Sequence, residues 1–154
     1  MAVYLDTFHV LQRPTYSSMY PPAQGAVLAL GERLGQPWIG VVLSMAAMFG
    51  AVLWMLQGWF PAEWALLGAS LLLLRIGTFT YWMNSYWGGA AAALGGALVM
   101  GALPRLLHGR GWWNAILLGL GTGILAHSRP FEGAVVCVPV YIVLACLLYT
   151  SRCV

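Results

Sequence analysis

Long apolar runs alternate with short polar stretches along most of the chain. Four runs, at 38–57, 61–80, 86–107 and 131–149, have close to the ~20 residues that an α-helix needs to cross ~30 Å of hydrocarbon. A fifth run, at 112–126, is shorter, but it begins with tryptophans and is followed by polar residues, which suits a helix anchored at both membrane interfaces. The pattern predicts an all-α, polytopic transmembrane bundle at 37–145 with about five spanning helices.

The segment 21–35, PPAQGAVLALGERLG, differs from these runs. At ~1.5 Å per residue it would reach only about 20 Å, and Glu32 and Arg33 would have to enter the lipid. We therefore expect a juxtamembrane amphipathic helix along the membrane surface. The polar and aromatic residues at 1–20 are expected to form an extracytoplasmic loop.

The number of membrane crossings between two loops predicts whether their polar residues lie on the same side of the membrane. Counting crossings from residue 38 places the loops at 81–86 and 127–130 with residues 1–35, and the loop at 104–111 on the opposite side. Arg105 and Arg110 make the second side cytoplasmic by the positive-inside rule. The side chains expected to gather on the extracytoplasmic face are Asp6, His9, Tyr16, Tyr20, Asn84, Tyr86, Trp87, His127, Arg129 and Glu132.

Composition supports the membrane assignment and excludes other classes of function. Hydrophobic residues make up 61% of the 154 residues and charged residues 7%, whereas roughly 25% of the residues in a typical soluble domain are charged. A net charge of +3 spread this thinly is no nucleic-acid footprint. The three cysteines have no spacing that favours a disulfide framework or a zinc site, and we expect no metal site.

The two ends of the chain carry expectations of their own. The segment 146–154, CLLYTSRCV, resembles the translation of a transposase adaptor used in sequencing libraries, and we expect it to be foreign to the protein. The start has no basic, apolar and cleavable leader. The chain is therefore interpreted as an interior piece of a longer membrane protein.

Small residues recur every four positions in the third long run, and such stripes let helices approach closely in lipid. One stripe is Gly88, Ala92 and Gly96; the other is Gly89, Ala93, Ala97 and Gly101. We expect this run to be the centre of the bundle. Gly119 and Gly123 repeat the spacing in the following run.

The stretch HSRPFEG, from His127 to Gly133, is the most polar interruption of the apolar sequence, and two interpretations stay open. It is an interfacial turn in which Arg129 reaches the headgroups and Glu132 complements the helix dipole. Alternatively, Arg129 and His127 form an anion site at membrane depth. Arg75 favours the second interpretation, because an arginine inside an apolar run is a functional candidate, although it can also snorkel or pair with a carboxylate.

Three stretches together resemble the bacterial membrane glycosyltransferases of the GT-C superfamily, with the Rgt-type, aminoarabinose transferase and protein mannosyltransferase families as the closest groups. They are DTFHVLQRPTYSSMYPPAQG, YWMNSYWGGAAAALGGALVMGALPRL and LLGLGTGILAHSRPFEG. The resemblance implies an enzyme of the bacterial inner membrane that moves a sugar from a polyprenyl-phosphate donor to an acceptor on the extracytoplasmic face. Neither the sugar nor the acceptor follows from it.

The resemblance also implies roles for particular residues. Tyr20 stands where relatives carry the lysine of a Lys-Pro-Pro-Leu element, and HSRPFEG occupies the place of a Thr-Lys-Gly-Pro element. The residues implied to bind the carrier phosphate are Arg129, His127, Arg75 and Tyr20, and those implied to contact the acceptor or brace the loops are His9, Tyr16, Asn84, Tyr86, Trp87 and Glu132. Asn84 and Ser85 replace an acidic residue of relatives, so a divalent metal, which the resemblance leaves open, has no support from this sequence.

The catalytic carboxylates of such enzymes belong to a motif that this chain lacks, and we expect them upstream of Met1. Transfer needs a carboxylate to deprotonate the acceptor hydroxyl, which is worth roughly 10²–10⁴-fold in rate. Asp6 is the candidate for a supporting role, and the chain alone is expected to be inactive.

Two other classes of function remain open. A transporter fragment would account for Arg75 and the glycine-rich run, but it predicts an inverted repeat, which the sequence does not show. A non-catalytic membrane scaffold subunit would use the polar loops to bind its neighbours.

Overall fold

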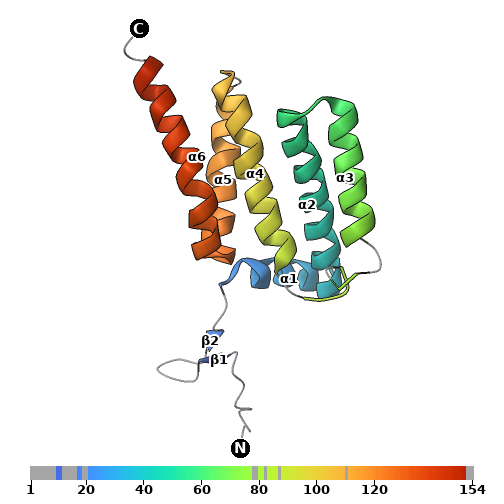
Figure 1. The fold of residues 1–154 in the computed structure, drawn as a ribbon. Helices are drawn as coiled ribbons and strands as arrows, with labels where there is room; N and C mark the ends of the chain where they lie inside the picture. The colour runs from blue at the N-terminus through green and yellow to red at the C-terminus, as the bar shows by residue number, and fades with distance from the viewer. Residues whose placement is uncertain are drawn as a thin grey trace, which may run out of the picture.

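The computed structural model describes residues 10–11, 17–18, 21–77, 80–81, 83–86, 88–109 and 111–151. Within these ranges the chain is helical apart from one short strand pair, and the all-α prediction is confirmed (Figure 1). The helices are α1 (Ala23–Arg33), α2 (Pro37–Trp59), α3 (Ala62–Ile76), α4 (Gly89–Leu107), α5 (Trp112–Ser128) and α6 (Pro130–Ser151). The strands β1 (Val10–Leu11) and β2 (Ser17–Ser18) are two residues each and pair antiparallel.

The five helices α2 to α6 stand side by side, and α1 runs across one end of them (Figure 1). That end also carries the described residues between α3 and α4 and the α5–α6 turn, whereas the last turn of α2 and the last turn of α4 lie at the other end (Figure 1). Residues 21–35, the described residues of 81–86 and the 127–130 turn therefore lie at one end of the bundle, while their common side of a membrane stays a prediction (Figure 1). The assignment of this short first helix to the membrane surface stays a prediction.

Three helices, α2, α4 and α6, are long and apolar enough to cross a membrane. The helices α3 and α5 have 15 and 17 residues, which span about 23 and about 26 Å. The helix α3 is thus shorter than the predicted run 61–80, whereas α5 is slightly longer than the predicted run 112–126. The predicted run 61–80 is helical only to Ile76, because Gly77 leaves the helical conformation at ψ −138° and its N–H donates to the Leu73 carbonyl. Length and composition thus support three spans and do not establish five.

The helix α4 lies at the centre of the packing, against α2, α5 and α6. Its contact with α5 is made backbone to backbone: an added Cβ at Gly121 would lie 2.7 Å from the Gly95 carbonyl oxygen, and one at Gly95 would lie 3.0 Å from the Gly121 carbonyl oxygen. The α2 contact uses Gly101, where an added Cβ would collide with the Trp54 ring.

The predicted glycine stripes therefore divide into two groups. The stripe that ends at Gly101 faces α2, where Ala93 and Ala97 also pack. An added Cβ at Gly96, Gly119 or Gly123 would meet nothing within 4 Å, so these three positions make no close helix contact among the described residues. The α5 contact instead uses Gly95 and Gly121, because the two helices are rotated so that Gly121 faces α4 while Gly119 and Gly123 do not.

Two glycines also fix α1 on the bundle. An added Cβ at Gly31 would lie 2.5 Å from the Gly40 backbone nitrogen, and one at Gly40 would collide with the Val27 carbonyl oxygen. The last turns of α1 thus lie directly on the first turn of α2, which leaves the first turn of α1 near α5.

Side-chain hydrogen bonds join α2 and α4 at the end opposite α1. Pro104 has no N–H, so the Met100 carbonyl loses its helical partner and accepts a hydrogen bond from Trp59 Nε1 at 2.9 Å. Arg105 donates to the Gly101 and Trp54 carbonyls, both at 2.7 Å, and its guanidinium lies 4.0 Å from the Trp54 ring centroid. These bonds give hydrogen-bond partners to the backbone oxygens of Met100, Gly101 and Trp54 at the end of the bundle opposite α1.

Candidate functional site

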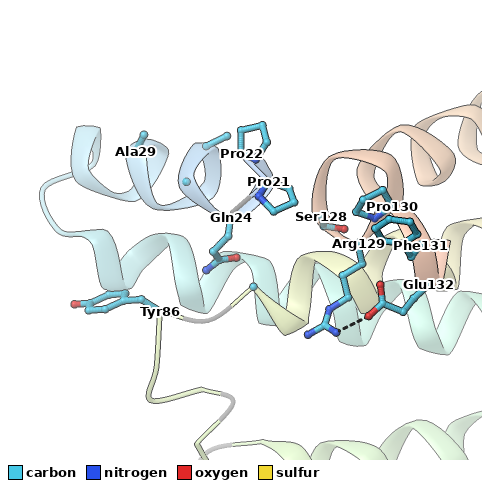
Figure 2. A pocket seen from close by; sticks show the side chains of 13 residues that line it. Pro21, Pro22, Gln24, Ala29, Tyr86, Ser128, Arg129, Pro130, Phe131 and Glu132 are labelled. Atoms are coloured by element: carbon cyan, nitrogen blue, oxygen red, sulfur yellow. Dashed lines mark hydrogen bonds and ion pairs between the residues drawn. The ribbon is translucent and has the colours of Figure 1, made fainter. Parts of the chain in front are cut away.

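A cavity of about 1250 Å³ opens at the α1 end of the bundle. It lies where three segments distant in the sequence meet: the start of α1, the connection before α4 and the α5–α6 turn (Figure 2). The lining residues are Pro21, Pro22, Gln24, Gly25, Ala26 and Ala29 from the first segment, Tyr86 and Gly88 from the second, and Ser128, Arg129, Pro130, Phe131 and Glu132 from the third. Most of these side chains are small or apolar, and the polar ones are few.

The α5–α6 turn consists of one residue, Arg129, between two helices. A residue before proline is disfavoured in the helical conformation, and Arg129 accordingly has φ −143° and ψ 78° before Pro130. Its N–H still donates to the Leu125 carbonyl at 2.8 Å and its carbonyl accepts from the Gly133 N–H at 2.7 Å. The local sequence Ser-Arg-Pro therefore ends one helix, starts the next and leaves the guanidinium at the rim of the cavity.

Arg129 forms an ion pair with Glu132, in which Nη1 donates to Oε1 at 3.2 Å (Figure 2). The two side chains are 56% and 65% exposed, so water screens the pair and it contributes little to stability. The bond engages one nitrogen of a guanidinium that carries five N–H donors. An added anion can therefore bind the remaining donors, but it would lie close to the negative charge of the Glu132 carboxylate.

Gln24 adds a polar group to the cavity that the sequence pattern did not single out. Its Oε1 atom is buried and has no hydrogen-bond partner among the residues that the structure describes. Figure 2 shows the side chain projecting from the first turn of α1 toward the chain before α4. The only sequence signal was a carboxamide in the first turn of a surface helix, which is a common feature of exposed helices.

The predicted site residues do not all meet at the cavity. Tyr86, Gly88, Arg129 and Glu132 line it. His127 is exposed on the last turn of α5 and does not line it. The other predicted residues fall into two groups: Arg75 and Asn84 are described away from the cavity, and Asp6, His9, Tyr16, Tyr20 and Trp87 lie outside the described residues.

Arg75 and Asn84 are separated from the cavity for identifiable reasons. Arg75 lies in the last turn of α3, and this helix packs against α2 rather than beside the α5–α6 turn. Asn84 Nδ2 donates to the Thr80 carbonyl at 3.0 Å, so the amide bonds to the same chain segment between α3 and α4 that contains it. The predicted cluster of Arg129, His127 and Arg75 is thus not assembled, and Arg129 is the cation that lines the cavity.

The described part of the site can bind an amphipathic anion but offers no free catalytic base. Its one carboxylate, Glu132, is paired with Arg129. A second, smaller cavity of about 410 Å³ shares Gly25, Ala29 and Tyr86 with the first and is lined by Glu32. No group of three or more His, Cys, Asp or Glu able to hold a metal occurs in the described ranges.

The helices and the cavity can be described without reference to any other protein. Its described residues form a mainly helical structure with three helices long and apolar enough to span a membrane and a mainly apolar cavity lined by one arginine. The chain matches no protein-family model, no curated protein and no solved structure.

Proposed function

We propose that the chain is part of an integral membrane glycosyltransferase of the GT-C type, and that its cavity holds the phosphate of a polyprenyl-phosphate-linked sugar donor. The observation that carries the proposal is the position of Arg129 at the rim of a largely apolar cavity at one end of the bundle. The motif resemblance supplies the reaction class, and the cavity supplies a place for the donor.

The chemistry of such a donor matches the cavity in its two halves. The isoprenoid chain needs apolar surface, which the two prolines before α1, the small residues of α1 and Phe131 provide. The phosphate needs a cation at the boundary of the lipid, and a guanidinium presents a planar set of donors that suits phosphate. The volume of about 1250 Å³ slightly exceeds the ~300–1,000 Å³ of ordinary ligand pockets, as suits a large ligand.

Membrane placement is also part of the proposal. In this proposal α3 and α5 also cross the bilayer, beside the three longer helices, and the short spans are accommodated by local thinning of the lipid. The exposed, stacked pair Trp112 and Trp113, with ring centroids 4.1 Å apart, anchors the start of α5 at one interface. The end with Arg105 is cytoplasmic, and the cavity faces the outside of a bacterial inner membrane.

The proposal also assigns donor binding and deprotonation of the acceptor to different parts of the enzyme. The described cavity residues bind and orient the donor, while the carboxylate that deprotonates the acceptor belongs to another part of the protein. Asp6 keeps its predicted supporting role there. The exposed Glu132 positions the Arg129 guanidinium and competes mildly with the phosphate for it.

Binding of a polyprenyl monophosphate to the full chain in lipid nanodiscs tests the proposal. Arg129→Gln is expected to weaken binding about 10-fold or more, since a hydrogen-bonded charge is lost. Arg33→Gln is the matched control, because Arg33 is an exposed arginine of α1 that lines neither cavity. Equal affinities of the two variants, or no binding by the unmodified chain, would contradict the proposal.

A further inference from the structure

The smaller cavity adjoins the larger cavity that Arg129 lines. It has a volume of about 410 Å³ and shares Gly25, Ala29 and Tyr86 with the larger one, so the two cavities meet at these three residues. Tyr86 is the only large side chain of the three, and it is 57% exposed. A ligand in either cavity can therefore reach the Tyr86 side chain.

The two cavities carry opposite charges. The larger one is lined by the Arg129 guanidinium, whereas the smaller one is lined by Glu32 from the last turn of α1. Glu32 is exposed and forms no ion pair among the residues that the structure describes, in contrast to Glu132, which is paired with Arg129. The oxygens of the Glu32 carboxylate can therefore accept hydrogen bonds from a ligand.

We propose that the smaller cavity binds the sugar of the carrier-linked donor, with the Tyr86 ring against the sugar and the Glu32 carboxylate accepting hydrogen bonds from its hydroxyls. The inference rests on the proposed function. It assigns the phosphate to Arg129 and the sugar to Tyr86 and Glu32, so Tyr86 contacts the donor rather than the acceptor. In Figure 2, Tyr86 and Arg129 lie on opposite sides of Gln24 around the larger cavity.

The chemistry of the lining residues decides which part of the donor lies in which cavity. A carboxylate repels a phosphate and only accepts hydrogen bonds, so the Glu32 side disfavours the phosphate and suits hydroxyl donors. An aromatic ring offers a flat apolar face that can cover the C–H groups of a sugar ring. The isoprenoid chain has no hydrogen-bond donor for Glu32 and finds apolar surface at Phe131 in the larger cavity. The smaller volume lies within the ~300–1,000 Å³ of ordinary ligand pockets, which suits a compact headgroup rather than a long chain.

The test compares two ligands, a polyprenyl monophosphate and its hexosyl ester, on the full chain in nanodiscs. Tyr86→Leu removes the ring, and Tyr81→Leu is its matched control, because Tyr81 is an exposed tyrosine between the same two helices that lines neither cavity. Glu32→Gln removes the charge and keeps the size of the side chain. Its matched control is Glu63→Gln, because Glu63 is an exposed carboxylate of α3 that lines neither cavity.

Tyr86→Leu and Glu32→Gln are each expected to weaken binding of the hexosyl ester by about 2- to 10-fold, the value of one aromatic contact or of the charge on one hydrogen-bond acceptor. Binding of the bare monophosphate is expected to stay unchanged, which also shows that the larger cavity is intact. Equal weakening of both ligands, or no weakening beyond that of the controls, overturns the sugar subsite while the proposed function stands. If the unmodified chain binds neither ligand, the proposed function fails and this inference with it.

Discussion

Replacing Gly121 by alanine tests whether α4 and α5 meet through their backbones. The added Cβ would lie 2.7 Å from the Gly95 carbonyl oxygen, 2.9 Å from Leu98 Cβ and 3.0 Å from Val99 Cγ2. A main-chain oxygen in the middle of a packed helix cannot shift alone, so the two helices have to separate. Overpacking of this kind costs about 1–3 kcal/mol of unfolding free energy.

The same helix provides two matched controls. An added Cβ at Gly119 or Gly123 would meet nothing within 4 Å. All three substitutions gain the same helix propensity, about 1 kcal/mol for glycine to alanine. Their differences therefore isolate packing, and Gly121→Ala is expected to be about 1–3 kcal/mol less stable than either control.

The assay is reversible unfolding in mixed lipid and detergent micelles, with helix content followed by far-ultraviolet circular dichroism. Stabilities of the three variants within about 0.5 kcal/mol of one another would refute backbone contact at this crossing. A larger loss for Gly119→Ala or Gly123→Ala than for Gly121→Ala would show that the outer face of α5 carries the packing.

Two further predictions concern hydrogen bonds at the two ends of the bundle. Trp59→Phe leaves the Met100 carbonyl without its donor and is expected to cost about 1–3 kcal/mol of unfolding free energy. The cost should be smaller in a Pro104→Ala background, because alanine restores a backbone N–H that can bond to the Met100 carbonyl. An equal cost with and without Pro104→Ala would argue against this role of Trp59. Glu132→Gln removes the carboxylate beside Arg129 and is expected to tighten binding of a polyprenyl monophosphate several-fold in nanodiscs, without changing helix content; weaker or unchanged binding would mean that the carboxylate does not compete with the phosphate.

Hydropathy and the number of crossings between loops anticipated much of the architecture. The alternation of long apolar runs with short loops was enough to place 21–35, Tyr86 and Arg129 at one end of the bundle, because each crossing reverses the chain. The charged pair at Glu32 and Arg33 was enough to predict a short helix outside the spans. Such inferences succeed because they depend on length and polarity rather than on side-chain packing.

Helix rotation was harder to predict. Several stripes of small residues in α4 have the same spacing of four, and the spacing does not say which stripe faces which neighbour. The Gly95 contact with Gly121 depends on how α4 and α5 are turned against each other, and this is decided by all neighbours together. The length of α3 was overestimated for a local reason, since an apolar run continues past the point where Gly77 leaves the helix.

Only some of the predicted site residues lie together at the cavity, for related reasons. Arg129 stood out in the sequence because it is an arginine in a polar interruption of an otherwise apolar sequence. Gln24 did not, because a glutamine in a surface helix normally faces water and only the approach of Gly88 encloses it. Arg75 was misplaced in the predicted cluster because its depth in the membrane says nothing about which helix its own helix packs against.

The most direct test of the account is photo-crosslinking of the full chain in nanodiscs with a polyprenyl phosphate that carries a diazirine near the phosphate, followed by mass spectrometry of the adducts. The account predicts adducts within 21–29, at Tyr86 and Gly88 and within 128–132, where the lining residues of the cavity lie, with competition by unlabelled polyprenyl phosphate. Adducts concentrated on the outer face of α3 or around Trp112 and Trp113, and insensitive to competitor, would contradict the claim that this cavity holds the carrier.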